Sequence, residues 1–180
     1  MLHGARIGSL IGAIFGLVFF LANSGPLGSP TANILEIVGI VLFLVTVYFG
    51  IFNSRDEIDA NPPSRDAMRV YGIAVAIEVA ALIGGLALIG LVLHAEYLSP
   101  MWIGLVVGVH FLPFAKAFGA PIFEILGIAM IAVAIIGALA GAIIDHRLSY
   151  WAAIVEGLLL FAAVIFGPIY NARHNAAAAS

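Results

Sequence analysis

Apolar residues fill most of the chain in six long runs, and each run ends at a turn-like or charged segment. A helix needs about 20 apolar residues to cross the hydrocarbon core of a bilayer, and backbone polar groups in lipid must be satisfied within the segment itself. The runs are too long for strands and do not alternate, so the pattern predicts six transmembrane helices. The predicted spans are Ile7–Ala22, Asn33–Phe52, Met68–His94, Met101–Ala115, Gly119–Ile144 and Ser149–Tyr170.

Composition supports the same class. Hydrophobic residues make up 63% of the 180 residues and charged residues only 9%, whereas soluble domains carry about 25% charged residues. We therefore expect an all-α integral membrane protein with a single membrane domain and the lipid bilayer as its main partner. The absence of cysteine excludes disulfides and thiolate metal sites. A formal net charge of −3 argues against a nucleic-acid partner, because phosphate binding needs a basic patch.

Basic residues are distributed unequally between the two sides of the predicted bundle. Six crossings place Arg147 alone on one side, and cytoplasmic loops carry the excess of lysine and arginine. This asymmetry predicts a multi-pass protein of an inner or plasma membrane with both termini cytoplasmic. The basic residues on the predicted cytoplasmic side are Arg6, Arg55, Arg65, Arg69, Lys116 and Arg173.

A glutamate followed three residues later by a glycine occurs twice in similar apolar surroundings. Glu36 and Gly39 lie in the second run, and Glu124 and Gly127 occupy matching positions in the fifth. Isoleucine and valine matches around them carry little weight in so apolar a chain. A recurring intramembrane glutamate with its glycine carries more, and it indicates an internal repeat.

The repeat extends to the other runs and divides the chain into two triplets. We interpret about residues 4–94 and 100–170 as two three-helix repeats, followed by a flexible tail at 171–180. Because three crossings is an odd number, the second copy enters the membrane from the opposite face. The predicted fold is therefore two inverted-topology repeats related by a pseudo-two-fold axis in the membrane plane.

Two glutamates are predicted to lie near the bilayer midplane. Glu78 and Glu156 each follow an interfacial arginine by nine residues, which corresponds to about 14 Å along a helix. A charged side chain at the bilayer centre costs about 2.5–3.5 kcal/mol even on lenient insertion scales. We therefore expect these two residues to be functional.

Three further residues are weaker candidates. Glu36 and Glu124 lie in the first turns of their helices, where the positive end of the helix dipole favours an anion. Each is therefore a structural cap or a functional relay. His110 lies in the inner half of the fourth run, close to Pro113, and is either a hydrogen-bonded histidine between helices or a ligand.

These residues favour a small transporter or channel for a cation, or for protons coupled to a small solute. Glu78 and Glu156 would form a midplane site, and Glu36 and Glu124 would act as outer and inner relays. His110 would be a neighbouring ligand or proton carrier. No catalytic residue is assigned under this hypothesis.

Two other functions remain open. Protonated carboxylic acids in an apolar cavity can act as general acids, so an intramembrane isomerase or cyclase acting on a lipophilic substrate is one alternative. A scaffold subunit whose glutamates bind a partner helix is the other. The sequence names no cofactor. A metal site with one histidine and several carboxylates stays open, although none of the four intramembrane glutamates has the Glu-x-x-His spacing of di-metal bundles.

Small residues recur at four-residue spacing in three of the runs. This spacing is typical of helices that pack closely in membranes, either within one chain or between copies in a homo-oligomer. The glycine-rich faces are Gly8/Gly12/Gly16, Gly104/Gly108 and Gly137/Gly141.

Overall fold

The computed structural model describes residues 4–52 and 65–178, and all regular structure within these ranges is helical. Six helices there are long and apolar enough to cross a membrane, which confirms the predicted all-α, multi-pass class. They are α1 (Gly4–Ser24), α2 (Thr31–Val47), α3 (Arg65–Ala87), α4 (Ser99–Ala117), α5 (Ile122–Ile143) and α6 (Arg147–Ala178).

Short irregular helices adjust the helix ends. Helices α2 and α3 continue directly into π-helical turns, η2 (Tyr48–Phe52) and η3 (Leu88–Leu93), which complete the second and third apolar runs. The 3₁₀ turns η1 (Gly25–Leu27) and η4 (Glu96–Leu98) lie in the connections that follow α1 and precede α4. Helix α6 passes the predicted end of the sixth run and continues to Ala178. The flexibility predicted for 171–180 stays a prediction.

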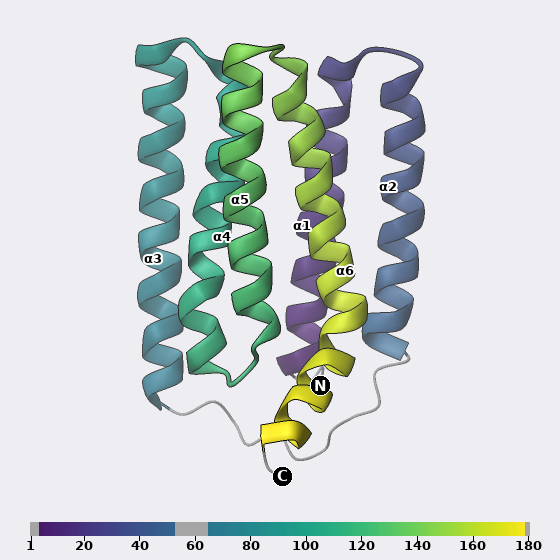
Figure 1. Cartoon of the computed structure of the whole chain (residues 1–180), viewed down its shortest axis with the longest axis vertical. Coiled ribbons are helices and arrows are strands. Elements are labelled where there is room, and N and C mark those ends of the chain that lie inside the picture. The colour runs from purple at the N-terminus through teal and green to yellow at the C-terminus, as the bar shows by residue number, and fades with distance from the viewer. Residues whose placement is uncertain (1–3, 53–64, 179–180) are drawn as a thin grey trace.

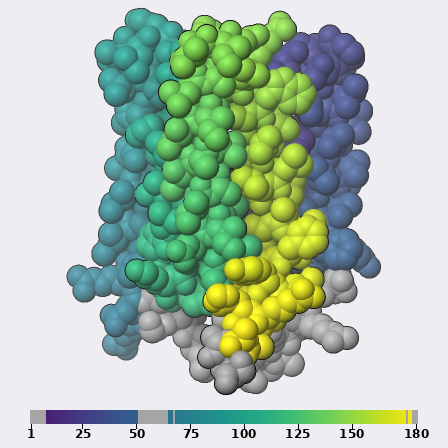
Figure 2. Space-filling view, viewed as in Figure 1, coloured from purple at the N-terminus to yellow at the C-terminus, as the bar shows by residue number. Residues whose placement is uncertain are grey.

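The six helices run alternately up and down, so that α1 begins and α6 ends at the same end of the bundle (Figure 1). We call this end the terminal side and the other end the opposite side. Helices α1, α4, α5 and α6 pack against one another in the order α4–α5–α6–α1, and we call them the central helices. Helix α2 packs mainly on α1 and α3 mainly on α4, and we call these two the edge helices. Figure 2 shows α5 and α6 covering the viewed face between the two edge helices.

The buried core lies among the central helices. One cluster is centred on Met130 of α5, which is fully buried, and a second cluster contains Phe20 and Phe161 with ring centroids 5.9 Å apart. Lipid is as apolar as these side chains, so the packing is stabilised by close van der Waals contact rather than by removal from water. The first cluster contains Phe19, Met101, Val107, Leu126, Met130, Ala153 and Leu160.

Glycines in the central helices allow that close contact. A Cβ added to Gly16 of α1 would lie 2.7 Å from the ring of Phe161 on α6. A Cβ added to Gly127 of α5 would lie 2.6 Å from the carbonyl oxygen of Gly108 on α4, so these two backbones approach each other directly. At these positions the small residues serve packing within one chain. Contacts between copies stay a prediction.

The predicted repeat pairs α1 with α4, α2 with α5 and α3 with α6. Helices α1 and α4 are both central, but α2 and α3 lie at the edges whereas α5 and α6 lie in the centre (Figure 1). Helices α5 and α6 pack along each other, whereas their predicted counterparts α2 and α3 do not. The packing of the described helices does not show an inverted repeat.

Candidate functional site

The carboxyl group of Glu156 lies in the middle of the central helices. Its α6 neighbours Ala153, Gly157 and Leu160 are buried at the three- and four-residue spacing of one helix face, and Glu156 occupies that face with 0% exposure. Neither of its carboxyl oxygens has a hydrogen-bond partner among the residues that the structure describes. An unpaired polar group so deeply buried costs free energy, so its presence needs an explanation other than packing.

Gly104 of α4 makes the space that this carboxyl group occupies. A Cβ added to Gly104 would overlap both oxygens and the carboxyl carbon of Glu156. Gly104 is itself buried on α4. The position of the Glu156 side chain therefore depends on a glycine in another helix.

Glu78 and His110 form a second polar group at the edge of the bundle. Glu78 lies on the side of α3 that packs against α4, and its Oε2 is 3.0 Å from Nδ1 of His110. The two atoms are close enough for an ion pair, although Nδ1 has no hydrogen-bond partner with suitable geometry. Their side chains are 15% and 11% exposed, respectively.

Aromatic rings surround His110 on the terminal side. The ring centroid of Phe114 lies 4.2 Å from that of His110 in an edge-to-face arrangement. Tyr71 of α3 stacks on Phe114 at 5.3 Å, and Phe118 and Phe123 meet Phe114 edge-on. The pair is therefore closed toward the terminal side by packed rings.

The structure does not bring Glu78 and Glu156 together into one midplane site. Glu78 contacts His110 from α3, whereas Glu156 packs against Gly104 from α6. His110 follows Gly104 by six positions, which places the two residues about 9 Å apart along α4 and about 120° apart around it. Helices α3 and α6 are not packed along each other in the described part of the chain. The candidate site thus consists of two separate groups that contact α4 at different positions.

Glu36 and Glu124 have different environments. Glu36 of α2 is half-buried and accepts a hydrogen bond of 3.1 Å from the hydroxyl of Ser24, which is fully buried at the end of α1. Glu124 is exposed in the first turn of α5. The N-terminus of α5 is instead capped from α6, where the side-chain oxygen of Asn171 accepts a hydrogen bond of 3.1 Å from the N–H of Ile122.

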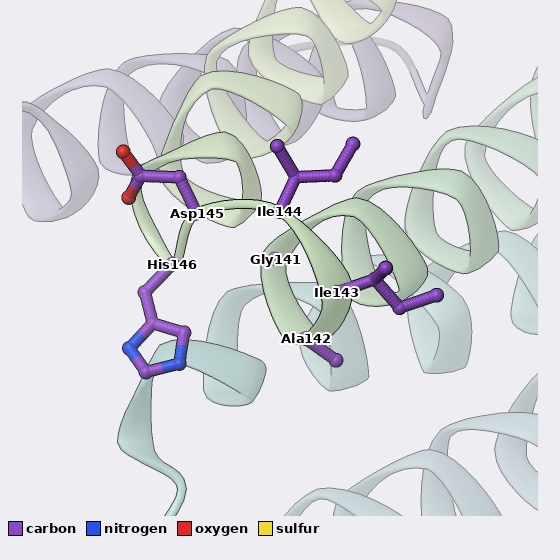
Figure 3. A pocket seen from close by; sticks show the side chains of 6 residues that line it. All are labelled: Gly141, Ala142, Ile143, Ile144, Asp145 and His146. Atoms are coloured by element: carbon purple, nitrogen blue, oxygen red, sulfur yellow. The ribbon is translucent and has the colours of Figure 1, made fainter.

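A pocket of about 290 Å³ opens where α5 ends on the opposite side, lined by Gly141–His146 (Figure 3). The side chains of Asp145 and His146 point away from each other, and the ring of His146 stacks on Tyr97 at 3.8 Å. Their polar groups therefore do not converge on one ligand position. Within residues 4–52 and 65–178 no group of three or more His, Asp or Glu side chains is placed to hold a metal ion.

Three residues have clear structural roles for which the sequence pattern gives no signal. Ser24 and Asn171 looked like ordinary loop and tail residues, and their partners Glu36 and Ile122 lie in other helices. Gly104 was assigned only to a close-packing face, and nothing in the sequence links it to Glu156. Each role depends on a contact between helices, for which helical periodicity carries no signal.

Comparisons with known proteins find no matching family model, no similar curated protein and no similar solved structure.

Proposed function

We propose that this protein is a small membrane transporter or channel that moves protons, alone or coupled to a small solute, through its intramembrane carboxylates. The carboxyl group of Glu156 is the observation that carries the proposal. It is completely buried against Gly104 of α4, on the α6 face whose residues Ala153 and Leu160 belong to the core, and it has no hydrogen-bond partner in the described residues. Packing alone would favour an apolar side chain at this position, because an unpaired polar group costs about 1–3 kcal/mol. A role in gaining and releasing a proton explains why a carboxyl group occupies this position despite that cost in free energy.

The Glu78–His110 pair is the second proton-exchanging group. A carboxylate and an imidazole 3.0 Å apart can share a proton directly. Buried ionisable residues in transmembrane segments commonly mark proton relays. We infer that the proton passes between this pair and Glu156 when α4 moves relative to its neighbours, since α4 contacts both.

Glu36 and Glu124 are proposed as relays near the two membrane faces. Glu36 lies near the start of α2 on the opposite side, and Glu124 near the start of α5 on the terminal side. The excess of basic residues on the terminal side supports cytoplasmic termini. The paired glutamate–glycine segments support descent of the two halves from one three-helix unit.

The test is proton flux in proteoliposomes under an imposed pH gradient. We expect Glu156→Gln to reduce the flux about a hundredfold or more, which is the usual size of a positioned proton-transfer group. Glu78→Gln should reduce it by a similar factor, because the substitution keeps the shape of the side chain and removes its titration. Glu96→Gln is the matched control, since Glu96 is an exposed carboxylate in η4, and its flux should equal that of the wild type.

Unchanged flux in a Glu78→Gln, Glu156→Gln double variant that reconstitutes normally would refute the proposal. The same assay repeated with a sodium or potassium gradient separates proton movement from cation conduction. If the flux follows the sodium or potassium gradient and does not depend on pH, the transported ion is the metal cation and not the proton.

A further inference from the structure

The two intramembrane carboxyl groups differ in their access to the surroundings of the bundle. Glu156 is 0% exposed, whereas Glu78 and His110 keep 15% and 11% of their side chains exposed. The residues on either side of Glu78 in the sequence, Ile77 and Val79, are 64% and 49% exposed. The pair therefore lies at an open seam between α3 and α4.

That seam is at membrane depth. Glu78 is ten residues from the start of the apolar span Met68–Leu93 and fifteen from its end, which correspond to about 15 Å and more than about 20 Å of helix. At this depth the medium around an edge helix is hydrocarbon. The exposed parts of Glu78 and His110 therefore face lipid.

The seam is closed along its length in both directions. Toward the terminal side, Tyr71 stacks on Phe114, whose ring meets His110. Toward the opposite side, the indole N–H of Trp102 donates a hydrogen bond of 3.0 Å to the carbonyl of Ala81, one turn beyond Glu78 on α3. The Trp102 ring also packs directly on Gly85. Among the described residues, the side facing the bilayer is the direction left open.

We propose that Glu78 is a carboxyl site reached from the bilayer and modified there by lipophilic carboxyl reagents of the carbodiimide class, while Glu156 is closed to them. The inference concerns access and holds whether or not the protein transports protons. Its functional meaning is that apolar molecules dissolved in the bilayer can reach the Glu78–His110 pair.

The reaction needs only the acid and the reagent. The carboxyl oxygen of Glu78 bonds to the central carbon of the carbodiimide while its proton moves to one nitrogen, which consumes one C=N bond. The acyl group then migrates from oxygen to nitrogen and yields a stable N-acylurea. No atom leaves, so the peptide gains the full mass of one reagent molecule.

The experiment treats the full chain in liposomes with N,N′-dicyclohexylcarbodiimide and maps the adducts by peptide mass spectrometry. In the wild type we expect the adduct on Glu78 and none on Glu156. Glu78→Gln should lose the adduct completely. A water-soluble carbodiimide, used in parallel, should modify exposed Glu96 and Asp145 and leave Glu78 unmodified.

An adduct on Glu156, or an unmodified Glu78, overturns the inference even if proton flux depends on Glu78. Modification of Glu78 by the water-soluble reagent also overturns it, because that result requires access from water. An adduct on Glu78 in a protein that moves no protons leaves the inference standing and removes the proposed function. The wild-type adduct pattern is the primary result, so the conclusion does not depend on the folding of any variant.

Discussion

Glu156 and Glu78 are the same residue type at similar predicted depth, yet the fold places them in contrasting environments. Glu156 lies among four helices, with no exposed surface and no hydrogen-bond partner among the described residues. Glu78 lies where a single edge helix meets α4, with His110 beside it and part of its side chain exposed. The number of helices packed around a carboxyl group, more than its depth, therefore determines its surroundings.

The largest effect on stability that tests this comparison is expected for the substitution Gly104→Ala. Gly104→Ala puts a Cβ into the Glu156 carboxyl group, and overpacking of this kind costs about 1–3 kcal/mol. Gly84→Ala on α3 is the matched control, because a Cβ there meets no atom within 4 Å. That control should stabilise the helix by about 0.5–1 kcal/mol. The measurement is the free energy of unfolding in mild detergent titrated with a denaturing one.

A second substitution distinguishes a steric clash between residue 104 and Glu156 from a general intolerance of α4 to substitution. Glu156→Ala in the Gly104→Ala background should recover part of the lost stability, because it removes the group that the new methyl meets. If Gly104→Ala destabilises the protein no more than Gly84→Ala does, the close packing of the Glu156 carboxyl group against Gly104 is wrong.

Replacing the carboxyl group by an apolar side chain should change the free energy of unfolding in opposite directions at Glu156 and Glu78. Glu156→Met removes an unpaired buried polar group and should raise the free energy of unfolding by about 1–3 kcal/mol. Glu78→Met removes the partner of His110 and should lower it by about 0.5–1.5 kcal/mol. Thermal unfolding of the two variants and the wild type in the same detergent shows whether each substitution raises or lowers stability. Destabilisation by Glu156→Met would indicate a partner that the packing of α4 and α6 does not reveal.

The smallest effects concern single hydrogen bonds at the edge and in the centre. Trp102→Phe removes the bond to Ala81 that joins α4 to α3, and Ser149→Ala removes the buried bond of 3.1 Å to the carbonyl of Gly137. Each should cost about 0.5–1.5 kcal/mol. Hydrogen exchange followed by mass spectrometry should show faster exchange confined to α3 in the first variant. Equal loosening of α5 and α6 by Trp102→Phe would argue against α3 as an independently attached helix.

Much of the architecture could be predicted from the chain alone because lipid imposes few choices. Each apolar run had to form a helix, and the structure shows six helices at those places, with ends shifted by a few residues. The segment most poorly predicted was the end of α6, which continues past Tyr170 to Ala178. Apolar run length cannot detect a helix that continues into polar residues.

The candidate site was only partly predictable. Glu78, Glu156 and His110 were identified because ionisable groups are costly in apolar runs, and the structure pairs Glu78 with His110. A common site for Glu78 and Glu156 required α3 and α6 to lie face to face, and they do not pack along each other in the described structure. Glu36 was predicted as either a cap or a relay, and its observed partner is the hydroxyl of Ser24.

The sequence by itself determined that this chain forms helices long and apolar enough to cross a membrane, and that four glutamates lie in its apolar runs, because hydrophobic run length and the cost of buried charge are local properties. Only the tertiary structure decided which helices are central and which lie at the edge. That choice depends on where small residues let backbones approach, as Gly108 and Gly127 do, and on which side chain fills the space beside a glycine, as Glu156 does beside Gly104. These contacts join residues far apart in the chain, and they bury Glu156 completely while Glu78 stays partly exposed.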